Sequence, residues 1–176
     1  IDAGETYVIY GSSTGFSSNF SLSLLDGSNG FILNGINTFL QQGVNSGDGA
    51  GFSVSEAGDI NADGVDDLII GASNAYPNSF DAIAAGEGYV VFGNTAGFGS
   101  QFELSDLDGS NGFVLDHGNL DGWLGHSVSN AGDINSDGID DIIIGAPAAI
   151  GFKGQSYVVF GNSTGFSSKL ELSSLN

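Results

Sequence analysis

The chain repeats itself, and this internal self-similarity constrains the fold more than any other feature of the sequence. The segment ETYVIYGSSTGFSSNFSL at 5–22 returns as EGYVVFGNTAGFGSQFEL at 87–104 and as QSYVVFGNSTGFSSKLEL at 155–172. A second pair, 74 residues apart, is GFSVSEAGDINADGVDDLIIGAS at 51–73 and GHSVSNAGDINSDGIDDIIIGAP at 125–147. Such a chain is expected to form similar supersecondary units that pack in series.

Each unit is expected to contribute four short strands to an all-β fold, because Gly, Asn, Asp and Ser fill the connections and no stretch has sustained helical periodicity. The predicted strands are 51–57 and 125–131, then 67–73 and 141–147, then 6–11, 88–93 and 156–161, and last roughly 20–24, 102–106 and 170–174. The second and third groups are continuous apolar runs, which are typical of strands buried on both faces.

The repeats divide the chain into three parts. We expect a partial repeat at 1–45, a full repeat at 46–119 and a second repeat at 120–176. About two and a half four-stranded units are too few to close a ring, so the chain alone is not expected to be a closed propeller.

Two acidic loops, DINADGVDD at 59–67 and DINSDGIDD at 133–141, are the strongest candidates for a functional site. Side-chain oxygens at positions 1, 3, 5 and 9 of such a loop can converge on one cation, with a backbone carbonyl from position 7. The candidate ligands are Asp59, Asn61, Asp63, the Val65 carbonyl and Asp67, and in the second loop Asp133, Asn135, Asp137, the Ile139 carbonyl and Asp141.

An all-oxygen ligand set of this kind favours Ca²⁺ at both loops. Mg²⁺ demands a stricter octahedron, and Zn²⁺ prefers the His or Cys ligands that these loops lack. An EF-hand begins with the same pattern but needs a Glu at position 12, where this chain has Ile70 and Ile144. The loops are therefore expected to join two strands of a hairpin. The competing interpretation is an acidic turn without a metal, which would suffer strong repulsion between its carboxylates.

The segment GDINSDGIDDIIIGAP at 132–147, followed by YVVFG at 157–161, resembles the FG-GAP repeat. That repeat builds the seven-bladed propeller of integrin α subunits and occurs in many bacterial surface proteins. The resemblance covers almost the entire chain, although the first copy reads GAS at 71–73. It implies calcium in the hairpin loops, blades of four antiparallel strands, and an extracellular or cell-surface role in adhesion or ligand recognition.

Acidic side chains dominate the charge, since 21 Asp and Glu stand against two Lys and Arg and give a formal net charge of −19. A field of this sign repels nucleic-acid phosphates and anionic membrane surfaces, so neither is expected as a partner. No apolar run approaches the roughly 18 residues of a membrane span, so membrane insertion is not expected. Hydrophobic residues make up 40% of the chain, which argues against an acidic disordered tail.

Several other polar or aromatic residues are expected to have structural roles. Asp66 and Asp140, at position 8 of the loops, are expected to be solvated turn charges facing away from the metal. We expect His117 to be solvated, His126 to be a packed or half-exposed strand residue, and Trp123 to pack against the neighbouring repeat. Asp48 and Asp121 precede strands, where turn formation is a better explanation than metal ligation.

No nucleophile elbow, Cys–His pair or phosphate-binding loop is present, so the chain is not expected to be an enzyme. The leading hypothesis is a calcium-stabilised structural or adhesion module that associates with further repeats or copies of the same protein, because repeat faces and strand edges need cover. A second hypothesis is a propeller fragment that binds a protein or a glycan. A third is a propeller attached to a secreted hydrolase or lyase.

Overall fold

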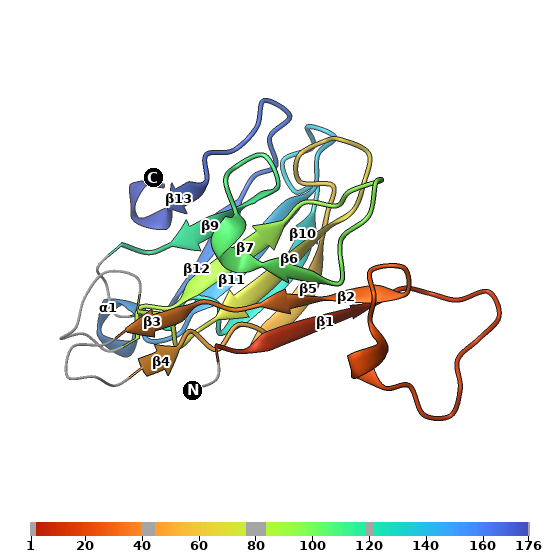
Figure 1. Cartoon of the computed structure of the whole chain (residues 1–176). Helices are drawn as coiled ribbons and strands as arrows, with labels where there is room; N and C mark the ends of the chain where they lie inside the picture. The colour runs from red at the N-terminus through yellow and green to blue at the C-terminus, as the bar shows by residue number, and fades with distance from the viewer. Residues whose placement is uncertain (1–2, 40–44, 77–83, 119–121, 176) are drawn as a thin grey trace.

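The computed structural model describes residues 3–39, 45–76, 84–118 and 122–175. Their strands form three sheets and a separate two-stranded hairpin (Figure 1). The predicted all-β class is confirmed. Helical structure among the described residues is limited to α1 (Ala149–Phe152) and to short 3-10 turns at Leu22–Leu24, Leu104–Asp106 and Leu172–Ser174. None of the described helices is long and apolar enough to cross a bilayer.

Each of the three sheets is built mainly from one repeat, and the first two also contain one strand from the next repeat. The first sheet has the order β1 (Glu5–Ile9), β2 (Gly30–Asn34) and β8 (Gln101–Glu103). The second has the order β13 (Lys169–Glu171), β9 (Gly112–Asp116), β7 (Glu87–Val91), β6 (Asp67–Ala72) and β5 (Ser53–Gly58). The third has the order β10 (Ser127–Gly132), β11 (Asp141–Ala146) and β12 (Gln155–Val159). The separate hairpin consists of β3 (Asn37–Phe39) and β4 (Asn45–Gly47).

The middle sheet is buried on both faces, because it lies between the other two sheets. Ile70 of β6 belongs to the core shared with the first sheet, and Ile69 belongs to the core shared with the third. This confirms the two-sided burial predicted for 67–73 and 88–93. The same prediction is wrong for β1 and for β12, whose residues are mostly exposed or half-buried, because both strands belong to outer sheets of the described chain.

The fourth strand of each repeat lies elsewhere than predicted. The segments at 20–24, 102–106 and 170–174 do not continue the antiparallel sheets. They contain 3-10 turns, preceded in two repeats by the short strands β8 and β13. The strands that complete the antiparallel order are β2, which pairs with β1, and β9, which pairs with β7.

The sequence DGSNGF explains where this fourth strand begins. Asp26 Oδ1 accepts a hydrogen bond from the Ser28 N–H (2.9 Å), and Asn29 Oδ1 accepts one from the Asp26 N–H (3.1 Å), so the side chains form a tight turn. Gly30 follows with φ +144°, and a Cβ on it would lie 2.1 Å from the Val8 carbonyl oxygen. Glycine therefore allows the close approach that starts β2 beside β1.

Parallel strands connect each repeat to the one before it. β8 belongs to the second repeat but pairs in parallel with β2 of the first. β13 belongs to the third repeat and pairs in the same way with β9 of the second. Each connection therefore covers the outer edge of the preceding sheet, which ties successive repeats together through backbone hydrogen bonds.

Two carboxyl groups share the buried hydroxyl of a tyrosine on β7, the central strand of the middle sheet. Tyr89, which is fully buried, places its hydroxyl 2.6 Å from Asp48 Oδ2 and 2.8 Å from Glu87 Oε2. Burial raises the pKa of Glu87 to about 7; the Tyr89 hydrogen bond opposes this shift, and the charge of Asp116 adds to it. Because one hydroxyl proton serves two carboxyl groups, the folded protein favours protonated Glu87.

This pKa shift predicts a pH dependence of stability. The folded pKa of Glu87 lies above its usual value of 4.5, so the folded state holds more protons than the unfolded state between about pH 4.5 and 7. The free energy of unfolding should therefore fall as pH rises through this window. Glu87→Gln should flatten that part of the profile in urea unfolding between pH 5 and 8, whereas the exposed control Glu56→Gln should not. Parallel profiles for Glu87→Gln and the wild type would contradict this assignment.

Candidate metal centre

The two acidic loops connect β5 to β6 and β10 to β11, so each closes an antiparallel hairpin as the sequence predicted. A shift in strand register directly precedes each loop, between Glu56 and Gly58 in the first hairpin and between Asn130 and Gly132 in the second. The position-12 residues that exclude an EF-hand, Ile70 and Ile144, are buried in the core.

The side chains of the first loop bond to the loop's own backbone. Asp59 accepts hydrogen bonds from the N–H groups of Asp63 (Oδ1···N 2.9 Å) and Gly64 (Oδ2···N 2.9 Å). Asn61 Oδ1 accepts a second bond from the Asp63 N–H at 3.0 Å, and Asp63 Oδ1 accepts one from the Val65 N–H at 2.9 Å. These bonds turn the side chains at positions 1, 3 and 5 toward the centre of the loop.

Asp67, at position 9, anchors the loop to the sheet. It is almost completely buried, and its carboxylate accepts hydrogen bonds from the N–H groups of Ile60 (3.0 Å) and Gly93 (2.7 Å). Burial raises the pKa of Asp67 to about 6, the two N–H donors oppose the shift, and the charges of Asp63 and Asp59 add to it. The loop therefore concentrates negative charge around a partly desolvated carboxylate.

The second loop repeats this arrangement. Its bonds join Asp133 to the N–H groups of Asp137 (3.0 Å) and Gly138 (2.9 Å), Asn135 to Asp137 (3.0 Å), Asp137 to Ile139 (2.9 Å), and Asp141 to Ile134 (3.0 Å) and Gly161 (2.9 Å). Two loops of different sequence thus adopt one hydrogen-bonded conformation.

The donor chemistry of both loops suits a hard divalent cation. Each offers three aspartates and one asparagine, and a carboxylate that accepts one or two N–H bonds keeps further lone pairs for a metal. Among the described residues, however, no three Asp, Glu, His or Cys side chains form a group that could hold a metal ion. The ligand roles of the ten residues named above, including the Val65 and Ile139 carbonyls, therefore stay predictions that rest on this chemistry.

Sequence reasoning missed two glycines that hold the loops. The N–H groups of Gly93 and Gly161 each bond to the position-9 aspartate of their repeat. A Cβ on Gly93 would lie 2.4 Å from both the Asp66 carbonyl oxygen and Val65 Cγ1, so glycine lets the end of β7 reach the loop. The signal was present in the sequence, because both glycines end the repeated segment Tyr-Val-Val-Phe-Gly.

A hydrogen bond between repeats joins the two loops. Asp140 Oδ2 accepts from the backbone N–H of Asp59 at 3.0 Å, and the Asn162 N–H donates to the Ile60 carbonyl at 2.9 Å. A Cβ on Gly58 would lie 2.2 Å from Asp140 Oδ2, so only glycine leaves room for this contact. The expectation that Asp140 is a solvated turn charge is therefore wrong, while its counterpart Asp66 is exposed.

The surroundings of the two histidines and of the tryptophan differ in part from those that the sequence predicted. His117 is buried and contacts the Tyr157 hydroxyl through Nε2, so the prediction of a solvated side chain is wrong. His126, expected to be a packed or half-exposed strand residue, is exposed and directly precedes β10, although its ring lies 4.9 Å from that of Phe52. Trp123 forms an edge-to-face pair with Phe152 of its own repeat, and its backbone N–H donates to the Ala84 carbonyl of the neighbouring repeat at 3.3 Å.

Asp48 has the turn role that was expected, because it accepts hydrogen bonds from the N–H groups of Ile36 (3.0 Å) and Ala50 (3.1 Å). Asp121, its suggested counterpart, lies outside the described residues.

Comparison with known proteins agrees with this architecture. The FG-GAP repeat family matches residues 50–92 and 124–159, which contain both loops and the strands around them. The chain carries FG-GAP repeats. Integrin alpha-4 of Xenopus laevis is 31% identical over 120 residues, which cover 65% of this chain and 10% of the integrin. Phosphatidylinositol-glycan-specific phospholipase D of Rattus norvegicus is 32% identical over 117 residues, 64% of this chain and 13% of that protein.

A third relative, integrin alpha-6 of Gallus gallus, is 32% identical over 111 residues, or 63% of this chain and 9% of the integrin. The chain thus matches about a tenth of the length of these relatives. Two integrins and a phospholipase share the same repeats with it, so the similarity identifies a propeller-type module.

The contact between loops predicts different effects for two aspartates at the same loop position. Asp140→Ala removes a hydrogen bond between a carboxylate and the Asp59 N–H, so it should lower the free energy of unfolding by about 1–2 kcal/mol. Asp66→Ala removes an equal charge from an exposed site and should change it by less than about 0.5 kcal/mol. Urea unfolding of both variants measures this difference, and equal effects would refute a role for Asp140 between the repeats.

Proposed function

We propose that this FG-GAP chain is a non-enzymatic, calcium-stabilised structural or adhesion module of an extracellular or cell-surface protein, and that it associates with further repeats or copies. The observation that carries the proposal is the shared conformation of the two loops, in which side-chain oxygens at the same positions bond to the same backbone N–H groups in both hairpins. The integrin and phospholipase relatives support an extracellular setting.

Calcium would act on these loops as a counter-charge. The predicted ligands place three carboxylates within nine residues, in a chain whose formal net charge is −19. A cation that binds the folded loops and not the unfolded chain stabilises the folded state. Because Asp140 of the second loop bonds to Asp59 of the first, order in the loops supports the junction between repeats.

The absence of a catalytic motif supports a non-enzymatic module. The phospholipase relative is an enzyme by name, but the matched segment covers only 13% of it. The same repeats occur in integrin alpha chains, so they are not specific to an enzyme. A catalytic domain in the full-length protein would favour the alternative of a propeller attached to a hydrolase.

Metal removal tests the calcium part of the proposal. At free calcium about 100 times above the dissociation constant, each site should add about 2.7 kcal/mol to the free energy of unfolding. The double variant Asp59→Ala/Asp133→Ala should lose the rise in melting temperature that calcium gives over EGTA. A control with equal charge change, Asp26→Ala/Asp108→Ala, alters two turns outside the loops and should keep the calcium-dependent rise. Identical wild-type melting temperatures in calcium and EGTA would refute calcium stabilisation.

The size of the particles in solution tests whether the chain associates with further copies of itself. Negative-stain electron microscopy and sedimentation should show elongated particles that grow with protein concentration in calcium and shorten in EGTA, because open strand edges and repeat faces recruit further copies. Discrete monomers of the same size in both conditions would rule out calcium-dependent assembly.

A further inference from the structure

A lysine and two carboxyl groups meet on one face of the middle sheet. Asp116 lies in β9 and is almost completely buried, and its Oδ2 forms an ion pair with the Nζ of Lys169 in β13. On the other side of β9, Glu87 of β7 is paired directly with Asp116 in the strand register. An amine, the carboxyl group that it contacts and a second carboxyl group thus come from three adjacent strands.

The strand register accounts for the contact between Lys169 and Asp116. β13 runs parallel to β9, and Lys169 aligns with Val114, two residues before Asp116. Side chains two residues apart in a strand share a face, so the lysine reaches the aspartate diagonally across the sheet. The contact therefore joins two repeats, because β9 belongs to the second repeat and β13 to the third.

The two carboxyl oxygens of Asp116 have different surroundings. Oδ1 accepts a hydrogen bond from the Gly118 N–H at 2.9 Å, whereas Oδ2 contacts the Lys169 amine. An N–H donor in this position stabilises the negative charge that develops on a carbonyl oxygen when a nucleophile attacks its carbon. Oδ1 is thus suited to remain as an amide oxygen, and Oδ2 is suited to leave.

Glu87 supplies an acid beside this pair. Burial raises the pKa of Glu87 to about 7, so a large share of the group is protonated near neutral pH. The charge of Asp116 raises this pKa further and the charge of Lys169 lowers it, so the three groups interact. The side chain of Lys169 is 46% exposed, which leaves a path for a released water molecule.

We propose that the Lys169 amine and the Asp116 carboxyl group condense to an amide, so that a covalent isopeptide bond joins the second and third repeats. The lysine ammonium group passes one proton to Oδ2, and the free amine attacks Cγ of Asp116. Glu87 then gives its proton to the departing hydroxyl group and takes one back from the attached nitrogen. One N–C bond forms, one C–O bond breaks, one water leaves, and Glu87 returns to its starting state.

The folded chain favours this condensation in two ways. Amide formation between a separate amine and acid is unfavourable in water, but groups held in contact react with effective molarities of about 10⁵–10⁸ M. The product also replaces two charges, one of them buried, by a neutral amide, which removes the desolvation cost of the ion pair. The bond goes beyond the proposed function and does not depend on calcium.

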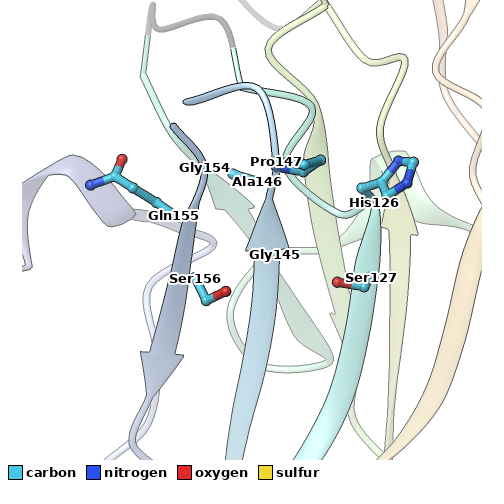
Figure 2. A pocket seen from close by; sticks show the side chains of 8 residues that line it. All are labelled: His126, Ser127, Gly145, Ala146, Pro147, Gly154, Gln155 and Ser156. Carbon is cyan, nitrogen blue, oxygen red and sulfur yellow. The ribbon is translucent and has the colours of Figure 1, made fainter. Parts of the chain in front are cut away.

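Equivalent positions elsewhere in the described chain lack one of these groups. At the junction between the first and second repeats, Gln101 takes the place of Lys169, and its amide nitrogen is not a nucleophile. In the third repeat, Gln155 takes the place of Glu87, and Figure 2 shows this glutamine at the start of β12, where it lines a pocket. Among the described residues, the complete set of Lys, Asp and Glu therefore occurs at one junction.

The mass of the intact 176-residue protein tests the bond. The folded wild type should weigh one water less than its sequence, and digestion should yield a branched peptide that contains both Asp116 and Lys169. Lys169→Arg keeps the positive charge but removes the amine, so it should have the full mass of its own sequence. The matched control is Lys153→Arg, which changes an exposed lysine outside the cluster and should keep the loss of water.

The lysine variants also exclude another source of the same mass change. An Asp-Gly pair can lose one water by forming a succinimide, and the chain contains several such pairs. That reaction needs no lysine, so a loss of water that persists in Lys169→Arg would overturn the proposal. A wild-type protein that unfolds cooperatively on heating and still has the full mass of its sequence would also overturn it.

Glu87→Gln tests the proton-transfer step. Chain dissolved from insoluble aggregates in urea is refolded, tryptophan fluorescence verifies the folding of both proteins, and mass is followed over time. Bond formation should be about 100-fold slower in Glu87→Gln, because general acid–base catalysis is lost. The wild-type rate should fall as the pH rises above about 7, where Glu87 loses its proton, and the variant should lack this fall. Equal rates in the two folded proteins would overturn the role assigned to Glu87.

Discussion

Burial of the middle sheet between its two neighbours is the interaction on which the rest of the structure depends. This five-stranded sheet has apolar side chains on both faces, so it cannot bury them alone. Ile70 and Tyr89 contribute to the core on one side of the sheet, while Ile69 and Val90 contribute to the core on the other. Stacking of repeats is therefore a condition for folding, and the parallel pairing of β8 and β13 reinforces it through the backbone.

The acidic loops add a second link between neighbouring repeats, and this link involves charged side chains. Within each loop, carboxylates bond to backbone N–H groups, which preorganises the oxygens and brings like charges together. Between loops, Asp140 bonds to the backbone of Asp59, so the conformation of one loop bears on the other. A cation in either loop would relieve repulsion within its own repeat and stiffen the junction. In this chain the two candidate loops therefore meet at the junction between the second and third repeats.

The hairpins and the fourth strands show the extent and the limit of sequence-based prediction here. The segments at 67–73 and 141–147 were identifiable because continuous apolar runs beside acidic turns leave few alternatives. β2 and β9 were missed because their three-residue apolar segments are short and follow DGSN turns whose side-chain bonds redirect the chain. His117 was taken as solvated because its neighbours are polar, but its burial comes from Tyr157, forty residues away.

The sequence by itself determined the repeats, the all-β class, the hairpin position of the loops and the chemical nature of their donors, since these depend on local pattern and residue type. Tertiary structure alone decided that Glu87, Asp116 and Lys169, which are far apart in the sequence, lie on three adjacent strands. It also decided which position-8 aspartate joins two repeats and which faces solvent. Equivalent sequences differ here because burial depends on the neighbouring repeat, and a local segment does not encode whether that neighbour is present.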